Sequence, residues 1–138
     1  GKIRLMIYEN IGYNQLKNLI FHEYAHVAIS YITKSNCPIW LNEGIAQYFA
    51  NINTQKLIIK TPTKSFKEIP DNWNNLKEQE IKELYDESFN LTATIINKTD
   101  EYIVQGILEN LGKNLKIENA LDDALSVYGY NWKTIFDH

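Results

Sequence analysis

His22-Glu23-Tyr24-Ala25-His26 places two imidazoles four residues apart, with a carboxylate next to the first of them. On a helix, residues four apart lie on the same face, so both imidazoles can point at one metal ion. Glu23 is rotated by about 100° from His22, because an α-helix has 3.6 residues per turn. Its carboxylate would therefore lie beside the metal, where it can take a proton from a metal-bound water. The motif predicts a metal-dependent hydrolytic site.

A short motif of this kind also arises by chance, and it is then a helix with two ordinary histidines and a surface glutamate. The surroundings favour the metal site, because the motif lies within a strongly helical segment and has apolar neighbours. A buried active-site helix would need such neighbours, which are Phe21, Tyr24, Ala25, Val27 and Ala28.

A catalytic zinc site needs three protein ligands and one open position, so the two histidines leave one ligand to find. Sixteen residues separate His26 from Glu43, which belongs to the segment Trp40-Leu41-Asn42-Glu43-Gly44-Ile45-Ala46. HExxH followed at this distance by W-L-x-E-G-x-A resembles the gluzincin zinc metallopeptidases of the peptidase MA-like superfamily. The sequence is especially similar to aminopeptidase-N-like enzymes and to small bacterial HExxH peptidase domains, and the specific part of the resemblance covers Phe21 to Phe49.

The resemblance implies that one Zn²⁺ is bound per chain by His22, His26 and Glu43. It implies a peptide or protein substrate, whose peptide bonds are hydrolysed by a zinc-bound water that Glu23 activates. It also implies that the two helices pack together, and Gly44 would let their backbones approach closely.

Gluzincins usually add a hydrogen-bond donor for the oxyanion, often a tyrosine or a histidine. Two of the three histidines are already ligands and His138 is terminal, so a tyrosine is favoured. Tyr85 is the first candidate and Tyr128 the second, and a packed helix tyrosine is the alternative for each. Gln47 could support a metal ligand from the second helix, although simple packing at the edge of the core is the favoured interpretation.

Two other functions compete with the peptidase. The chain could be a catalytically inactive zincin-like binding or structural module of a larger protein, although the base Glu23 would then serve no chemical need. It could also be a zinc hydrolase that acts on something other than peptides. Substrate profiling would separate these alternatives.

The elements that must position these residues are mostly helical. Apolar spacing predicts helices, and β-prone runs predict strands. The fold class expected is mostly α (α+β) and zincin-like, with a small N-terminal β-sheet, the HExxH helix, a Glu-bearing helix and a C-terminal helical bundle. The predicted strands are Lys2–Glu9 and Gln55–Lys60, and the predicted helices are Tyr13–Thr33, Ile39–Asn51, Lys77–Asn97, Thr99 or Asp100 to Leu111, Ile117–Tyr128 and Asn131–Phe136, with a loop over Thr61–Asn75.

Composition narrows the class of protein. The 138 residues are enough for a single zincin-like catalytic domain, 1–138, which could be excised from a longer chain. A net charge of −3 without a basic run argues against a nucleic-acid partner, and no apolar run is long enough to span a membrane. A lone cysteine, Cys37, excludes a disulfide framework. Similar bacterial domains often belong to envelope or secreted proteins, which favours that location over the cytoplasm.

Overall fold

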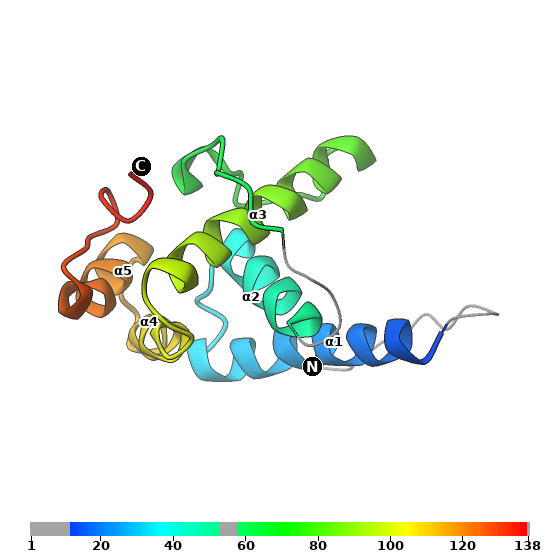
Figure 1. Cartoon of the computed structure of the whole chain (residues 1–138), viewed down its shortest axis with the longest axis horizontal. Helices are drawn as coiled ribbons and strands as arrows, with labels where there is room; N and C mark the ends of the chain where they lie inside the picture. Colours follow the sequence, from blue (N-terminus) through cyan, green and yellow to red (C-terminus); the bar gives the residue numbers. More distant parts are fainter. Residues whose placement is uncertain (1–11, 53–57, 138) are drawn as a thin grey trace.

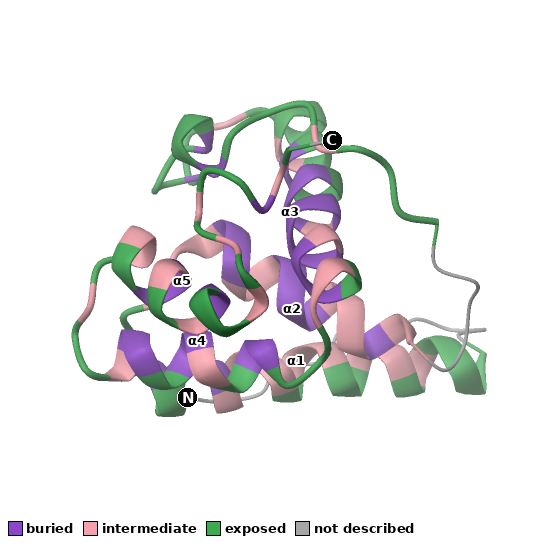
Figure 2. Ribbon diagram, turned by 60° about the vertical axis from the view of Figure 1, so that its left-hand side comes forward, coloured by how far each residue is buried: buried purple, intermediate pink, exposed green. Residues whose placement is uncertain are grey.

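Five α-helices account for most of the described residues, 12–52 and 58–137, in the computed structural model. Helix α2 lies between α1 and α3, and α4 packs on both α1 and α5 (Figure 1). Buried residues concentrate along α2, α3 and α4, whereas α1 is mainly half-buried or exposed (Figure 2). The helices are α1 (Tyr13–Thr33), α2 (Ile39–Asn51), α3 (Glu78–Lys98), α4 (Ile103–Gly112) and α5 (Ile117–Leu125), with the 3₁₀ turns η1 (Phe66–Glu68) and η2 (Ser126–Tyr128).

Helix α1 has the bounds that its apolar spacing predicts, and a tight turn connects it to α2. The turn begins where Lys34 and Ser35 adopt left-handed backbone angles, with φ of 53° and 62°. The backbone N–H of Ser35 donates to the carbonyl of Ser30 at 2.9 Å, which satisfies a carbonyl left free at the end of the helix. Pro38 then caps the start of α2 with a φ of −59°, in the early position that proline tolerates.

From the sequence we expect Gly44 where α2 meets α1, but it lies where α2 meets α3. A Cβ atom at Gly44 would stand 2.4 Å from the carbonyl oxygen of Ser88 and 2.1 Å from Oγ1 of Thr92, both on α3. Only glycine lets the two backbones approach this closely. The contact fixes α2 on α3 immediately beside Glu43.

The predicted α+β zincin-like fold is wrong for the described part of the chain, which contains no β-strand between residues 12 and 52 or between 58 and 137. The mostly helical character was predicted correctly. Lys2–Glu9 and positions 55–57 lie outside the described residues, and residues 58–60 form no strand.

A strand needs a neighbouring strand to pair its backbone N–H and C=O groups. In the segment before η1, side chains of α3 accept hydrogen bonds from the backbone N–H groups instead. Oδ1 of Asn90 accepts from the backbone N–H of Lys60 at 3.1 Å. The buried carboxylate of Glu87 accepts from the backbone N–H groups of Thr63 and Lys64, at 2.5 Å and 2.6 Å. The extended chain is therefore tied to a helix and not to a sheet.

Of the other predicted elements, some are confirmed and one is wrong. The loop predicted over Thr61–Asn75 is confirmed and contains the 3₁₀ turn η1. The helix expected over Ile117–Tyr128 ends at Leu125 and continues as η2. The helix predicted over Asn131–Phe136 is wrong, because these residues form turns. The side-chain oxygen of Asn131 accepts from the backbone N–H of Lys133 at 2.9 Å and of Thr134 at 3.0 Å, which competes with helix formation in so short a segment.

Among the described residues, no helix combines the length and apolar character that crossing a membrane requires.

Candidate metal centre

Two neighbouring helices carry the three residues that the sequence predicts as ligands. His22 and His26 lie one turn apart on the face of α1 that packs against α2, and Glu43 lies near the start of α2. All three side chains are half-buried. The tight turn after Thr33 sends the chain back alongside α1, and this reversal brings Glu43 to the two imidazoles.

The three side chains converge on one point. Nε2 of His22 lies 3.0 Å from Nε2 of His26. The Glu43 carboxylate lies with Oε2 at 3.4 Å from Nε2 of His22 and with Oε1 at 3.5 Å from Nε2 of His26. One ligand atom from each residue falls within 4.8 Å of the others, so the group could hold a metal ion.

These separations fit a small tetrahedral ion. Two donors bound to zinc at about 2.0–2.2 Å with tetrahedral angles stand about 3.3–3.6 Å apart. The two His–Glu distances, 3.4 Å and 3.5 Å, fall in that range, and the His–His distance of 3.0 Å is slightly shorter. In addition, Oε2 of Glu43 is buried and accepts no hydrogen bond from the described residues. A cation between the three donors would satisfy that oxygen.

The electrostatics of the group also favour a positive charge at this point. Burial alone would raise the pKa of the Glu43 carboxyl, but the adjacent imidazoles of His22 and His26 outweigh burial and lower that pKa to about 2. The contact with Glu43 raises the pKa of His26 against the opposing effect of burial, and Asn42 adds to the increase. Glu43 is therefore an ionised ligand across the physiological range.

Glu23 lies beside this group without joining it. Its side chain is half-buried, and its charge contributes to raising the pKa of His26. This is the arrangement expected of a carboxylate one residue after the first ligand on a helix. The motif's apolar neighbours are less buried than expected, because Phe21 and Tyr24 are 50% and 63% exposed.

The two candidate tyrosines have different surroundings. Tyr85 lies on α3 with its ring edge-on to buried Trp73 at a centroid distance of 5.4 Å. Burial raises the pKa of Tyr85, and the negative charges of Glu43 and Glu23 raise it further, so its hydroxyl lies within electrostatic range of the site. Tyr128 instead donates a hydrogen bond to Asp100.

The hydrogen bond described for Gln47 joins it to α3 and not to a metal-ligand candidate. Its Nε2 donates to the backbone carbonyl of Tyr85 at 3.0 Å, which links α2 to the segment of α3 that carries this tyrosine. Packing at the edge of the core, the favoured interpretation, describes its contact better.

Sequence reasoning missed Asn42. Its Oδ1 lies 2.6 Å from Nδ1 of His26, the ring nitrogen that faces away from Glu43. Metal-binding histidines commonly donate that second N–H to an acceptor in the protein. The signal that could have found it was its place directly before Glu43 in the second helix.

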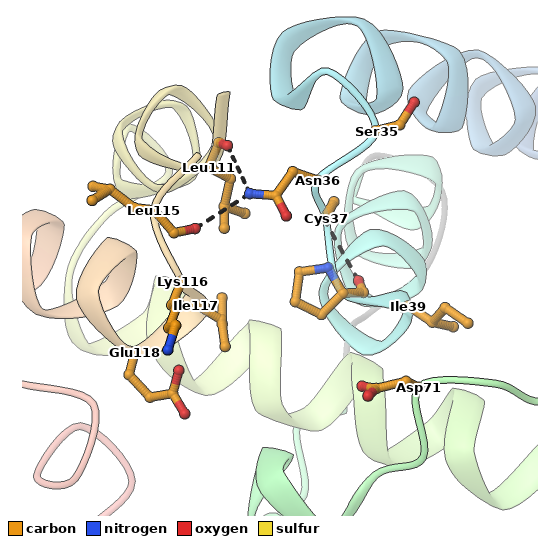
Figure 3. Close-up of a pocket in the computed structure, with 11 residues that line it drawn as sticks. Ser35, Asn36, Cys37, Ile39, Asp71, Leu111, Leu115, Lys116, Ile117 and Glu118 are labelled. Atoms are coloured by element: carbon orange, nitrogen blue, oxygen red, sulfur yellow. Dashed lines mark hydrogen bonds between the residues drawn. The ribbon is translucent and has the colours of Figure 1, made fainter. Parts of the chain in front are cut away.

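A pocket of about 410 Å³ opens elsewhere, at the turn between α1 and α2 and the start of α5 (Figure 3). Nδ2 of Asn36 donates there to the carbonyls of Leu111 and Leu115, at 2.9 Å and 3.3 Å. Cys37 also lines this pocket, and burial raises the pKa of its thiol to about 12. The pocket contains none of the three metal-ligand candidates.

Comparison of the chain with protein-family models, with curated proteins and with solved structures finds no match. The geometry of the site and the motifs that form it therefore carry the information about function.

Proposed function

We propose that this chain is a zinc metallopeptidase of the gluzincin type, with His22, His26 and Glu43 holding one Zn²⁺. The observation that supports the proposal is the convergence of three ligand atoms within 4.8 Å on two packed helices. Two imidazoles and one carboxylate are a donor set that zinc favours in catalytic sites, and they leave a coordination position for substrate or water.

The chemistry divides between the metal and the side chains. Zinc, when bound by such a set, lowers the pKa of a coordinated water towards about 7 and polarises a carbonyl as a Lewis acid. Glu23 accepts the proton that the attacking water loses and delivers it to the nitrogen of the leaving amine. One carboxylate, that of Glu23, thus both accepts and donates the proton that peptide hydrolysis transfers.

Tyr85 is proposed as the hydrogen-bond donor to the oxyanion that develops on the substrate carbonyl. Its proximity to the charges of Glu43 and Glu23 supports this position, and its contact with Trp73 holds the ring. The raised pKa keeps the hydroxyl protonated at neutral pH, as a donor must be.

Glu23→Gln tests the proposed base. The substitution keeps the size of the side chain but removes its capacity to accept a proton, so hydrolysis of an unfolded protein such as casein should fall at least about 10²-fold while zinc stays bound. Peptide release is measured with and without a chelator, beside zinc content by elemental analysis. Turnover close to that of the parent would remove Glu23 from this role.

The same assay separates the peptidase from the inactive binding module. A parent protein that binds zinc but releases no peptides from any unfolded substrate, with or without added metal, would favour the module. Chelator-sensitive peptide release that Glu23→Gln abolishes would favour the enzyme.

A further inference from the structure

We propose that Asn42 is a positioning residue, which holds the proton of His26 on Nδ1 and turns Nε2 of the same ring towards the metal. The inference rests on the proposed zinc site and adds the residue that orients one of its ligands.

The contact itself defines the tautomer. The atom of Asn42 that faces Nδ1 of His26 is the carboxamide oxygen, at 2.6 Å, and this oxygen can only accept a hydrogen bond. Nδ1 must therefore carry a hydrogen. In the neutral imidazole the lone pair then resides on Nε2, the atom that lies 3.5 Å from Oε1 of Glu43.

Consecutive residues of α2 hold the two edges of one ring. Asn42 and Glu43 are rotated by about 100° from each other on the helix. Asn42 reaches the outer nitrogen of His26, and Glu43 faces the inner nitrogen. Any movement of this turn of α2 would displace Glu43 and at the same time rotate the ring of His26. The geometry of the site therefore depends on how α2 packs.

The side chain of Asn42 is not needed to build the helix. The backbone N–H of Asn42 already donates to the carbonyl of Pro38 at 3.0 Å, so the start of α2 is bonded without it. Asparagine is also a mediocre residue inside a helix, where it costs more than alanine. A role towards His26 accounts for its presence better than a role in α2 alone.

Zinc affinity of the purified protein tests the proposal. Zinc is titrated against a chromophoric chelator in the parent, in Asn42→Ala, in Asn42→Asp and in the matched control Asn51→Ala. Asn51 lies at the other end of α2, and its side chain is half-buried and bonds to the backbone of Gln47 instead of to a histidine.

Loss of a partner of this kind weakens metal binding by about 10- to 100-fold. Asn42→Ala should show that loss, Asn42→Asp should bind zinc at least as tightly as the parent, and Asn51→Ala should leave zinc affinity unchanged. Asn42→Ala that binds zinc within about twofold of the parent would overturn the proposal. A parent that binds no zinc would instead overturn the proposed function itself.

A measurement on the parent keeps the proposal testable if Asn42→Ala fails to fold. Nitrogen-15 NMR of the zinc-loaded protein identifies which ring nitrogen of His26 carries hydrogen. Hydrogen on Nδ1 is expected, with zinc affecting the Nε2 signal. Hydrogen on Nε2 and zinc at Nδ1 would contradict the assignment.

Discussion

Individual residues in the site differ in how much their neighbours restrict them. Glu43 is fixed by two imidazoles that lower its pKa to about 2, and it has a buried oxygen without a hydrogen bond from the described residues. His26 is held at both ring nitrogens, by Asn42 and by the group of ligand atoms. The charge of Glu23 raises the pKa of His26, and the charges of Glu43 and Glu23 raise the pKa of Tyr85. The residues held by direct contacts within the group suit ligands, and the residues beside the group suit roles towards a substrate.

Tyr85→Phe should impair turnover with little effect on substrate binding. The substitution removes one donor to the developing oxyanion, and loss of such a donor lowers kcat by about 10²- to 10³-fold. Zinc content should not change, because the hydroxyl is not a ligand. Kinetics on a peptide substrate give kcat and KM separately.

Tyr128→Phe is the matched control for that substitution, because Tyr128 bonds to Asp100 instead of lying near the site. It should leave both kinetic constants close to those of the parent. An unchanged kcat in Tyr85→Phe, or an equal loss in the two variants, would exclude Tyr85 as the donor.

Cys37 gives a pH-dependent prediction. Burial raises the pKa of its thiol from the ordinary 9.0 to about 12. The folded protein thus holds this proton more tightly than the unfolded chain does, so the contribution of Cys37 to the free energy of unfolding is intact below pH 9.0 and is lost as the pH rises towards 12.

Alkylation measures this difference, since only the thiolate reacts. At pH 9, iodoacetamide should modify Cys37 at least about tenfold more slowly in the folded protein than in guanidinium chloride, after correction with a free thiol in the same solutions. Equal rates would show that the thiol is not buried as described.

Individual helices matter because the site spans two of them and a third fixes their packing. Helix α2 carries Glu43 and contacts both α1 and α3. Its approach to α3 depends on Gly44, where any side chain would collide with Ser88 and Thr92. The position of Glu43 relative to the two histidines therefore depends partly on the contact between Gly44 and α3.

Gly44→Ala should destabilise the fold by about 1–3 kcal/mol, the usual cost of forcing extra volume into a packed interior. The matched control is Gly106→Ala in α4, where an added Cβ would meet Ala124 at an ordinary 3.7 Å. That variant should gain about 0.5–1 kcal/mol, because alanine loses less entropy in a helix than glycine. Urea unfolding measures both, and a Gly44→Ala variant as stable as the parent would contradict the described packing.

Sequence reasoning predicted the two site helices best. The bounds of α1 and α2 follow from regular apolar spacing and from Pro38, which are local signals. The turns at Asn131–Phe136 were missed because local side-chain hydrogen bonds of Asn131, which compete with helix formation, decided the structure of this short segment. Asn42 was missed because its contact depends on how closely two helices approach, which spacing along one chain does not specify.

The molecule as a whole places the metal group on one face of α1 and a set of exposed aromatic residues on the other. Tyr13, Tyr24 and Tyr31 are 79%, 63% and 87% exposed, while Ile29 and Thr33, on the side of His22 and His26, are buried. The three ligand candidates thus lie where α1 meets the rest of the fold. A metal there would join α1 to α2, and binding should depend on all three residues at once.

Zinc content tests the central claim most directly. The parent protein is loaded with zinc at neutral pH, freed of excess metal and analysed for its elements, beside Glu43→Ala and the control Glu109→Ala, which alters an exposed glutamate on α4. We expect about one zinc per chain in the parent and in Glu109→Ala, and a clear loss in Glu43→Ala. No zinc in the parent, or equal zinc in all three proteins, would contradict the three-ligand site.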